Sequence, residues 1–367
     1  MGGPAKDTRA MHPELALCHS CLGRVASRIR QGMPRPPGTD PAAECFVCRG
    51  LMDGLEDLAG AALERISGYD YETFAVGATL KPSVLDRDDY IRSRTGAAGA
   101  ASIKVALTGE VGRMISRRTK KRVDRADPDL TILLDTRFGS CEVRSRPAVV
   151  YMRYTKTRRG VPQKRTPCGS CAGSGCDGCG FSGSGPSVEG MLAGYLLERL
   201  GGTDVRFTWV GGEDRDSLVL GRGRPVYARV RNPTRSAAAL PESASLDGVE
   251  ASGMRTAAGV PDRLPPFRSL ARIVVRFGGE PDLRRVKTLA GRVMVVTGPG
   301  RPSAKEVGPV RYRRVSGDSF RMDAEVEGGT PIKRLVSGEG VEPSVSSVLG
   351  AECACARFDF LDVVGNS

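Results

Sequence analysis

Two glycines and three carboxylates follow the end of a short predicted strand. Apolar residues alternate through 205–209, which is the period of a half-buried strand, and residues 211–216 then read Gly-Gly-Glu-Asp-Arg-Asp. A carboxylate held at a strand end by such a turn, with arginines nearby, is suited to act as a nucleophile on an anionic substrate. Asp214 is the candidate. Taken alone, the segment also fits an ordinary acidic hairpin turn, because Gly and Asp are among the commonest turn residues.

A second Gly-Gly turn, at residues 328–329, is followed by two cations. The pattern predicts that a strand over 320–326 runs into this turn and that Lys333 and Arg334 come directly after it. A buried lysine at this point could pair with a distant carboxylate, for which Asp214 is the best candidate. The alternative is a surface turn with solvated Lys and Arg side chains.

Two CxxC pairs lie within the first fifty residues. Each pair can present two sulfurs to one tetrahedral ion, so the spacing predicts a structural four-thiolate zinc site. Four ordinary free cysteines are the alternative, and His12 or His19 could replace a sulfur ligand. The predicted ligands are Cys18, Cys21, Cys45 and Cys48.

A tighter Gly-rich cluster of two further CxxC pairs can hold a second zinc or form a compact, reduced, metal-free finger. Its ligands would be Cys168, Cys171, Cys176 and Cys179. The adjoining cations predict a basic finger that touches phosphates, against the alternative of a solvated charged loop. These cations are Arg158, Arg159, Lys164 and Arg165.

Periodicity predicts the elements that position these groups. An amphipathic helix is expected over 51–68, and Ser187 should cap a helix over 188–200 that Gly201 and Gly202 end. Residues 233–267, rich in Ala, Ser, Gly and Pro, are expected to form a long loop or insertion. Further helices are expected over 281–290 and 343–349, and further strands over 225–231, 272–277, 293–296 and 310–315.

Charge indicates a polyanionic partner. The 367 residues have a net charge of +13, and residues 113–165 contain 16 Lys and Arg against 5 Asp and Glu, a net charge of +11. This imbalance favours nucleic acid over a membrane surface. No apolar run is long enough to span a bilayer and no signal peptide is recognisable, so a cytoplasmic location is expected.

Taken in order along the chain, these segments resemble the Pus-ten family of archaeal and eukaryal tRNA pseudouridine synthases. The resemblance extends over nearly the whole chain. It includes the first CxxC pairs, a THUMP-like basic region, the second cysteine cluster, the loop at Asp214 and the C-terminal turn. The matching motifs are Arg113 to Arg122, Pro128 to Leu130, Arg153 to Lys156, Arg158 to Gln163, Ser187 to Glu189, Gly212 to Asp214, Leu220 to Pro225, Gly329 to Lys333 and Pro343 to Ser344.

The resemblance implies an α+β fold in four segments. Residues 1–50 would be the zinc-binding segment, 51–165 a THUMP-like RNA-binding domain and 166–186 a Cys/Gly-rich basic finger. Residues 187–367 would be the catalytic domain, built on a mixed, mainly antiparallel sheet with flanking helices. Zinc would be structural, the chemistry would need no cofactor, the partner would be tRNA, and no membrane or protein partner is implied.

The resemblance also assigns roles to single residues. Asp214 would be the catalytic nucleophile that detaches uracil so that it can rejoin the ribose through carbon, at positions 54 and/or 55 of the TΨC loop. Lys333 would hold that carboxylate ionised in a dry pocket. Independently of the resemblance, alternation along an extended chain predicts that Glu213 points away from Asp214. Lys333, Pro331, Gly329 and Arg224 would bind the substrate. RNA would be bound by Arg153, Lys156, Arg158, Arg159, Lys164 and Arg165.

Six positions depart from the family pattern, and residues 287–296 lack its Tyr-x-Ala segment. Arg334, Ser337 and Glu339 stand where the family has Glu, His and Asp. Gly212 and Leu218 stand where the family has Arg, and Pro331 stands where it has Tyr. The competing hypothesis is therefore a divergent, catalytically weak or inactive relative that acts as a tRNA-binding module. A THUMP-bearing methyltransferase is disfavoured, because no Gly-rich adenosine-binding loop follows a strand.

Overall fold

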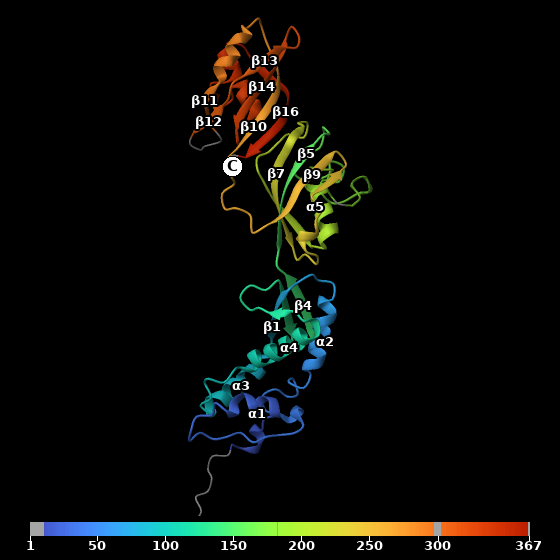
Figure 1. Ribbon diagram of the computed structural model, residues 1–367, viewed down its shortest axis with the longest axis vertical. Helices are drawn as coiled ribbons and strands as arrows, with labels where there is room; N and C mark the ends of the chain where they lie inside the picture. Colours follow the sequence, from blue (N-terminus) through green and yellow to red (C-terminus); the bar gives the residue numbers. More distant parts are fainter. Residues whose placement is uncertain (1–10, 182, 297–301, 366–367) are drawn as a thin grey trace, which may run out of the picture. The chain divides into compact units, whose positions relative to one another are not determined.

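A computed structural model of the protein describes residues 11–181, 183–296 and 302–365. The chain forms two compact units, Met1–Arg146 and Pro147–Ser367. The fold is α+β, as predicted (Figure 1). Within the described residues, no helix is long and apolar enough to cross a membrane.

The first unit has a four-stranded sheet covered by helices. The strand order is β2-β1-β3-β4, with β1 parallel to β2 and β3, and β3 antiparallel to β4. Its core includes the first cysteine pairs and the apolar stripe of α2, which is the amphipathic helix predicted over 51–68. The elements are α1 (His19–Ala26), α2 (Leu55–Ile66), β1 (Thr73–Thr79), α3 (Pro82–Arg94), α4 (Ile103–Thr119), β2 (Arg122–Val123), β3 (Leu130–Asp135) and β4 (Ser140–Ser145), with short 3-10 helices at Pro13–Leu15 and Ala42–Glu44.

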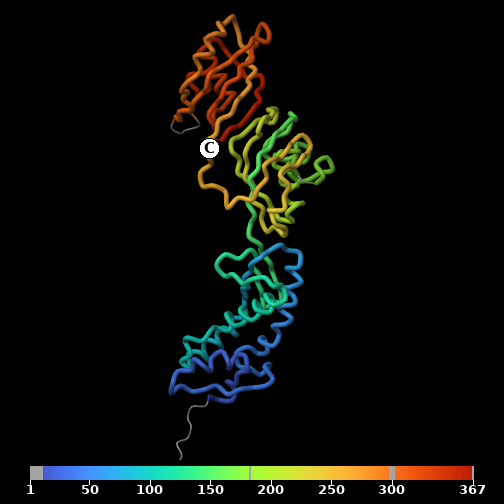
Figure 2. Tube along the Cα trace, viewed as in Figure 1, coloured from blue at the N-terminus to red at the C-terminus, as the bar shows by residue number. Residues whose placement is uncertain are grey.

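The second unit is built on a twelve-stranded, mainly antiparallel sheet, with the main path β15-β11-β12-β14-β10-β16-β7-β5-β9-β8. In addition, β13 pairs with β14 and β6 pairs with β7. Figure 2 traces the second unit from β5, in green, to the red C-terminal strand. Its strands are β5 (Ala148–Lys156), β6 (Asp204–Trp209), β7 (Val219–Arg231), β8 (Ser243–Leu246), β9 (Val249–Ala257), β10 (Phe267–Phe277), β11 (Gly291–Val295), β12 (Ser303–Val307), β13 (Arg311–Arg314), β14 (Ser319–Glu327), β15 (Val341–Glu342) and β16 (Cys353–Gly365).

The helices of this unit cover two separate hydrophobic cores. One core lies under α5, which Ser187 caps with its side chain and Gly201 ends in a left-handed conformation, as predicted. The other lies under the helices that follow β10 and β14. The helices are α5 (Val188–Leu200), α6 (Ile332–Ser337) and α7 (Val345–Leu349), with 3-10 helices at Asp177–Cys179, Ala237–Ala239 and Leu283–Leu289.

The two halves of the large sheet meet where β7 runs parallel to β16. A single registered pair, Val219 and Phe360, joins them, and the Phe360 amide donates to the Leu218 carbonyl at 2.9 Å. Both Gly-Gly turns come close to this junction, since residues from both turns line one cavity. The junction is therefore where the chemistry predicted from sequence can be assembled.

One prediction of local structure was wrong. Residues 233–267 are not one long loop, because they contain the antiparallel pair β8 and β9. Their small inward-facing residues, such as Ala244 and Ala251, provide a strand pattern without large apolar side chains. The chain also divides into its two compact units after Arg146, ahead of β5, whereas residues 51–165 were predicted to form one domain. The division into four functional segments stays a prediction.

Candidate functional site

The loop at 210–218 connects β6 to β7, and its second residue is a glycine that no other residue could replace without strain. Gly211 has a φ of 81°, and a Cβ there would lie 2.5 Å from Arg224 Nη1 and 2.5 Å from Phe267 Cζ. Both the backbone conformation and the space around it therefore require glycine. This tight turn lets the three carboxylates follow within seven residues of the strand end.

Asp214 and Lys333 form an ion pair across the junction. Lys333 Nζ lies 2.5 Å from Asp214 Oδ2, and the side chains remain 65% and 41% exposed, respectively. The hydrogen bond to Asp214 raises the pKa of Lys333, so the lysine stays charged at neutral pH. The two residues expected to pair do so, but the expectations of a buried lysine and a dry pocket were wrong, because the pair is open to solvent.

Glu213 points the opposite way and is fully buried. Its carboxylate accepts from Arg224 Nε at 2.8 Å and from the Tyr154 hydroxyl at 2.7 Å. Gln163 Nε2 donates to that hydroxyl at 2.9 Å and to the Gly211 carbonyl at 3.2 Å. Burial, followed by the Glu213 charge, raises the pKa of Tyr154 well above its usual value. This network fixes the inner side of the loop.

Lys156 donates hydrogen bonds to the backbone of the same loop. Its buried Nζ donates to the carbonyls of Val161 at 2.7 Å, Asp214 at 2.9 Å and Arg215 at 3.3 Å. Burial lowers the pKa of this lysine, although nearby carboxylates oppose the shift. In this arrangement the ammonium group cannot reach an RNA phosphate. The burial of Lys156 therefore argues against the predicted RNA contact.

A small cavity lies between the two Gly-Gly turns. Its volume is about 140 Å³, which suits one small planar group better than an extended ligand. Arg224 lines it, stacks over the Phe360 ring at 4.6 Å and has an Nη2 without a hydrogen-bond partner among the described residues. The cavity is lined by Gly211, Gly212, Arg224, Phe267, Ser269, Val326, Glu327, Gly328, Gly329, Thr330 and Phe360.

The four predicted substrate-binding residues occupy different positions around this cavity. Arg224 and Gly329 line it, whereas Pro331 caps α6 and is not among the lining residues. Lys333, in the first turn of α6, reaches Asp214 instead. Asp214 itself lies two residues beyond the lining glycine Gly212. The site thus combines an exposed carboxylate, its lysine partner and an adjacent cavity with an unsatisfied arginine donor.

The remaining predicted RNA-binding residues differ in their solvent exposure and in their bonding partners. The half-buried Arg153 donates at 2.7 Å to the carbonyls of both Arg222 and Gly223, so it ties β5 to β7. Arg158 pairs with Asp247 at 2.6 Å and Arg159 with Asp359 at 2.6 Å, both partly exposed. Two exposed residues have no ion-pair partner in the described part of the chain and stay the best placed for phosphates: Lys164 and Arg165.

The first cysteine tetrad has the geometry of a metal centre. All four thiols are buried, their sulfurs lie within 4.8 Å of one another, and Cys18 Sγ is 3.7 Å from Cys48 Sγ. A tetrahedral zinc with Zn–S bonds of about 2.3 Å requires sulfurs about 3.8 Å apart. The group contains neither His12 nor His19, so the sulfur set fits zinc without a substitute ligand. The members are Cys18, Cys21, Cys45 and Cys48.

The second tetrad has similar sulfur spacing but is less buried. Cys168 and Cys176 sulfurs are 4.0 Å apart, and those of Cys171 and Cys179 are 3.9 Å apart. All four lie within 4.8 Å of one another at half-buried positions. This finger could also bind zinc, with more access to solvent than the first tetrad.

Sequence reasoning missed the inner network of Tyr154, Gln163, Glu213 and Arg224. A signal was present in β5, where Val150, Met152, Tyr154 and Lys156 alternate. Since alternate residues of a strand share a face, Lys156 follows the buried side of β5. The basic composition of the region concealed this pattern.

Two family descriptions match the chain. "Pus10 THUMP domain, archaeal" matches residues 58–135, and "Pus10, C-terminal" matches residues 149–252. A protein of Cenarchaeum symbiosum (strain A) named tRNA pseudouridine synthase Pus10 is 38% identical, over 96% of this chain and 91% of its own length. A protein of the same name from Nitrosopumilus maritimus (strain SCM1) is 35% identical, over 95% of this chain and 94% of its own length.

Solved structures resemble the chain only weakly. A chain in the crystal structure of the archaeal box H/ACA sRNP Nop10-Cbf5 complex aligns with a TM-score of 0.30 at 11% identity, covering 57% of this chain and 46% of that chain. This likeness is too low to bear on function.

Proposed function

We propose a nucleophile and a target for this chain, which belongs to the Pus10 family of tRNA pseudouridine synthases and is therefore an isomerase that acts on tRNA. The proposed nucleophile is Asp214, and the proposed targets are uridines 54 and/or 55 of the TΨC loop. The observation that supports this most is the open ion pair of Asp214 and Lys333 beside the cavity. A base inside a folded loop must first leave its stack to reach such a site.

The isomerisation needs no outside reagent. The bond from ribose C1′ to uracil N1 breaks, a bond from C1′ to C5 forms, C5 loses a proton and N1 gains one. In the proposal, Asp214 either attacks the sugar or removes a proton from it, and Lys333 keeps the carboxylate charged and oriented. The cavity would receive the detached uracil, with Arg224 supplying a hydrogen-bond donor.

The test of this function is pseudouridine mapping on an unmodified tRNA transcript incubated with the purified protein. We expect new pseudouridine at position 54, position 55 or both. A protein that binds the transcript but forms no pseudouridine would favour the competing function, a tRNA-binding relative in which Gly212 and Pro331 have replaced groups that the reaction needs.

We also propose that each tetrad holds one structural zinc ion. The supporting observation is that both sets of sulfurs match a tetrahedral four-thiolate centre, which leaves no position for a reactive water. Metal analysis of purified protein should give two zinc equivalents. The double variant Cys45→Ser/Cys48→Ser should lose one, and Cys176→Ser/Cys179→Ser should lose the other; unchanged zinc content in either would exclude that site.

Phosphate contacts are proposed for the THUMP-like region and for the basic finger. Lys164 and Arg165, which adjoin the finger, are exposed and can make them. Replacing both by Ala should reduce the dependence of log affinity on log salt by roughly 0.7–0.9 per lost contact. An unaltered slope would place the RNA elsewhere. The cysteines in CxxC pairs have a spacing that suits metal binding rather than disulfides, which supports the proposed cytoplasmic location.

A further inference from the structure

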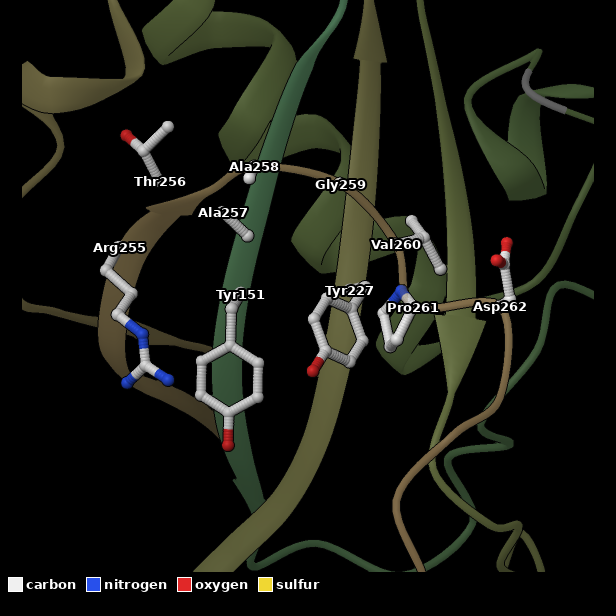
Figure 3. A pocket seen from close by; sticks show the side chains of 10 residues that line it. All are labelled: Tyr151, Tyr227, Arg255, Thr256, Ala257, Ala258, Gly259, Val260, Pro261 and Asp262. Carbon is white, nitrogen blue, oxygen red and sulfur yellow. The ribbon is translucent and has the colours of Figure 1, made fainter.

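The face of β5, β7 and β9 opposite to α5 presents a row of aromatic and cationic side chains. Tyr151 on β5 lies directly across from Tyr227 on β7 and from Arg255 on β9. Figure 3 shows the three side chains projecting from neighbouring strands on the same side of the sheet. Their neighbours on the other face, such as Met152 and Ala228, belong to the core under α5. These three residues are therefore not part of that core.

The three side chains contact one another in a row and form a platform of aromatic and cationic groups. The Arg255 guanidinium lies 4.3 Å from the centroid of the Tyr151 ring, and the Tyr151 and Tyr227 centroids are 5.2 Å apart with planes at 64°. Both tyrosines are half-buried and Arg255 is exposed. Among the described residues, neither phenolic hydroxyl has a hydrogen-bond partner. The platform thus offers aromatic faces and free polar groups together.

The chain that follows β9 closes one side of the platform into a pocket of about 530 Å³. Residues 257–262 form this side, and Figure 3 shows the Pro261 ring beside Tyr227. Asp262 contributes an exposed carboxylate at the rim. The pocket shares no lining residue with the cavity near Asp214. It is therefore a separate site of a size that takes a compact ligand.

Cations surround the platform on the same face. Arg229 lies two residues beyond Tyr227 on β7 and pairs in register with Arg206 on β6, so both share the platform's face. Both are exposed. Arg206 makes only a long contact of 3.8 Å with Asp204, and Arg229 has no ion-pair partner within the described ranges. Phosphates placed beside the platform would meet this positive charge.

We propose that Tyr151, Tyr227 and Arg255 form a binding subsite for an unpaired nucleobase of the tRNA, outside the catalytic site. Aromatic rings and arginine planes stack on any base, and Arg229 and Arg206 attract the adjoining phosphates. The free hydroxyls and Asp262 offer acceptors to the amino and imino groups of a base. The inference rests on the proposed tRNA binding and not on the isomerisation.

The test compares matched variants of the full chain in binding an unmodified tRNA transcript. Tyr227→Leu should weaken binding about tenfold, because it removes the stacking face, whereas Tyr227→Phe should stay within about twofold of wild type. Arg255→Ala, an exposed substitution that leaves both rings in place, should weaken binding about threefold to tenfold. Arg284→Ala, which removes an exposed arginine from the 3-10 helix Leu283–Leu289, is the control and should bind like wild type.

Two further readouts separate this subsite from its alternatives. Transcripts containing 4-thiouridine should photo-crosslink to peptides that contain Tyr151 or Tyr227, and at saturating RNA the variants should keep the wild-type rate of pseudouridine formation. Wild-type affinity in both Tyr227→Leu and Arg255→Ala would overturn the proposal. The proposal would also be overturned if the protein formed a concentration-dependent dimer that Tyr227→Leu abolished without any change in RNA binding. In that case this face of the sheet would bind a second copy of the chain. If the wild type binds tRNA but forms no pseudouridine, the proposed function fails while the binding comparison still decides the subsite.

Discussion

The two sides of the loop at 210–218 place neighbouring carboxylates in opposite surroundings. On the inner side, the Glu213 side chain has no solvent exposure and is bonded to Arg224 and Tyr154. On the outer side, Asp214 is 41% exposed and paired with Lys333. One peptide bond therefore separates an acid that fixes the loop from an acid that is open to a substrate. The difference shows that burial, more than residue type, decides which carboxylate can react.

The same difference has energetic consequences. Removing one partner of a buried ion pair leaves an uncompensated charge and costs about 3–5 kcal/mol, whereas an exposed pair contributes about 0–1 kcal/mol. Substitutions on the inner side should therefore change the stability of the fold, and substitutions on the outer side should change the reaction.

The largest effect on stability is expected from Glu213→Gln. The substitution leaves the Arg224 guanidinium buried without its counter-charge, so the free energy of unfolding should fall by about 3–5 kcal/mol. Urea unfolding followed by circular dichroism measures it. The outer-side substitution Asp214→Asn is the control, with an expected change below about 0.5 kcal/mol. Equal stability of the two variants would remove the distinction between the two sides.

Lys156→Met should have the next largest effect. Three backbone carbonyls lose a charged donor while the apolar bulk stays, so we expect a loss of about 1–3 kcal/mol in the free energy of unfolding. The salt dependence of tRNA affinity should not change. A salt slope lower by roughly 0.7–0.9 with unchanged stability would instead mean that Lys156 contacts a phosphate.

Lys333→Met should affect the rate more than the fold. We expect pseudouridine formation to slow about tenfold, and the free energy of unfolding to change by less than about 0.5 kcal/mol because the pair is exposed. Single-turnover assays and urea unfolding measure the two quantities. An unchanged rate would show that the lysine does not assist Asp214.

The pH dependence of this ion pair follows from the raised pKa of Lys333. When the pKa of a basic side chain is higher in the folded than in the unfolded protein, its charge stabilises the fold fully at pH values below the unfolded-state pKa. This stabilisation is lost as the pH rises through the folded-state pKa. Lys333 therefore stays charged through the neutral range, and the ratio of wild-type to Lys333→Met rates should be constant from about pH 6 to about pH 9. A ratio that falls within this window would mean that the lysine loses its proton there.

The smallest effect is expected for Asp216→Asn. Asp216 is exposed, and its backbone carbonyl, not its side chain, accepts from Arg159. The rate should stay within about twofold of wild type and the unfolding free energy within about 0.5 kcal/mol. A severe loss of activity in the single-turnover assay would move the catalytic assignment from Asp214 to Asp216.

Local patterns were sufficient to predict the outer side of the loop. The strand before Gly211, the Gly-Gly turn before Lys333 and the helix capped by Ser187 all have periodicity or turn residues that specify them. The Asp214–Lys333 pair joins residues far apart in the chain, and the family resemblance identified it because motif order reflects a shared fold. Exposure of the pair could not be predicted, because it depends on how the two halves of the sheet meet.

The inner side could not be predicted from composition. Lys156 lies in a strongly basic stretch, and only its alternation with Val150, Met152 and Tyr154 indicates that it is buried. One carbonyl partner, Val161, is close in sequence, but the Asp214 carbonyl comes from a segment that is 58 residues away. Likewise, Glu and Arg are residue types that usually lie on the surface. Glu213 and Arg224 can be buried here because their ion pair compensates the cost of removing both charges from water.

The most direct test of the central claim is single-turnover release of tritium from C5 of uracil-labelled tRNA by Asp214→Asn, measured together with tRNA affinity. We expect tRNA affinity to stay within about twofold of wild type while release falls at least about a thousandfold, since the nucleophile is lost and the fold is kept. Wild-type release by Asp214→Asn would contradict it.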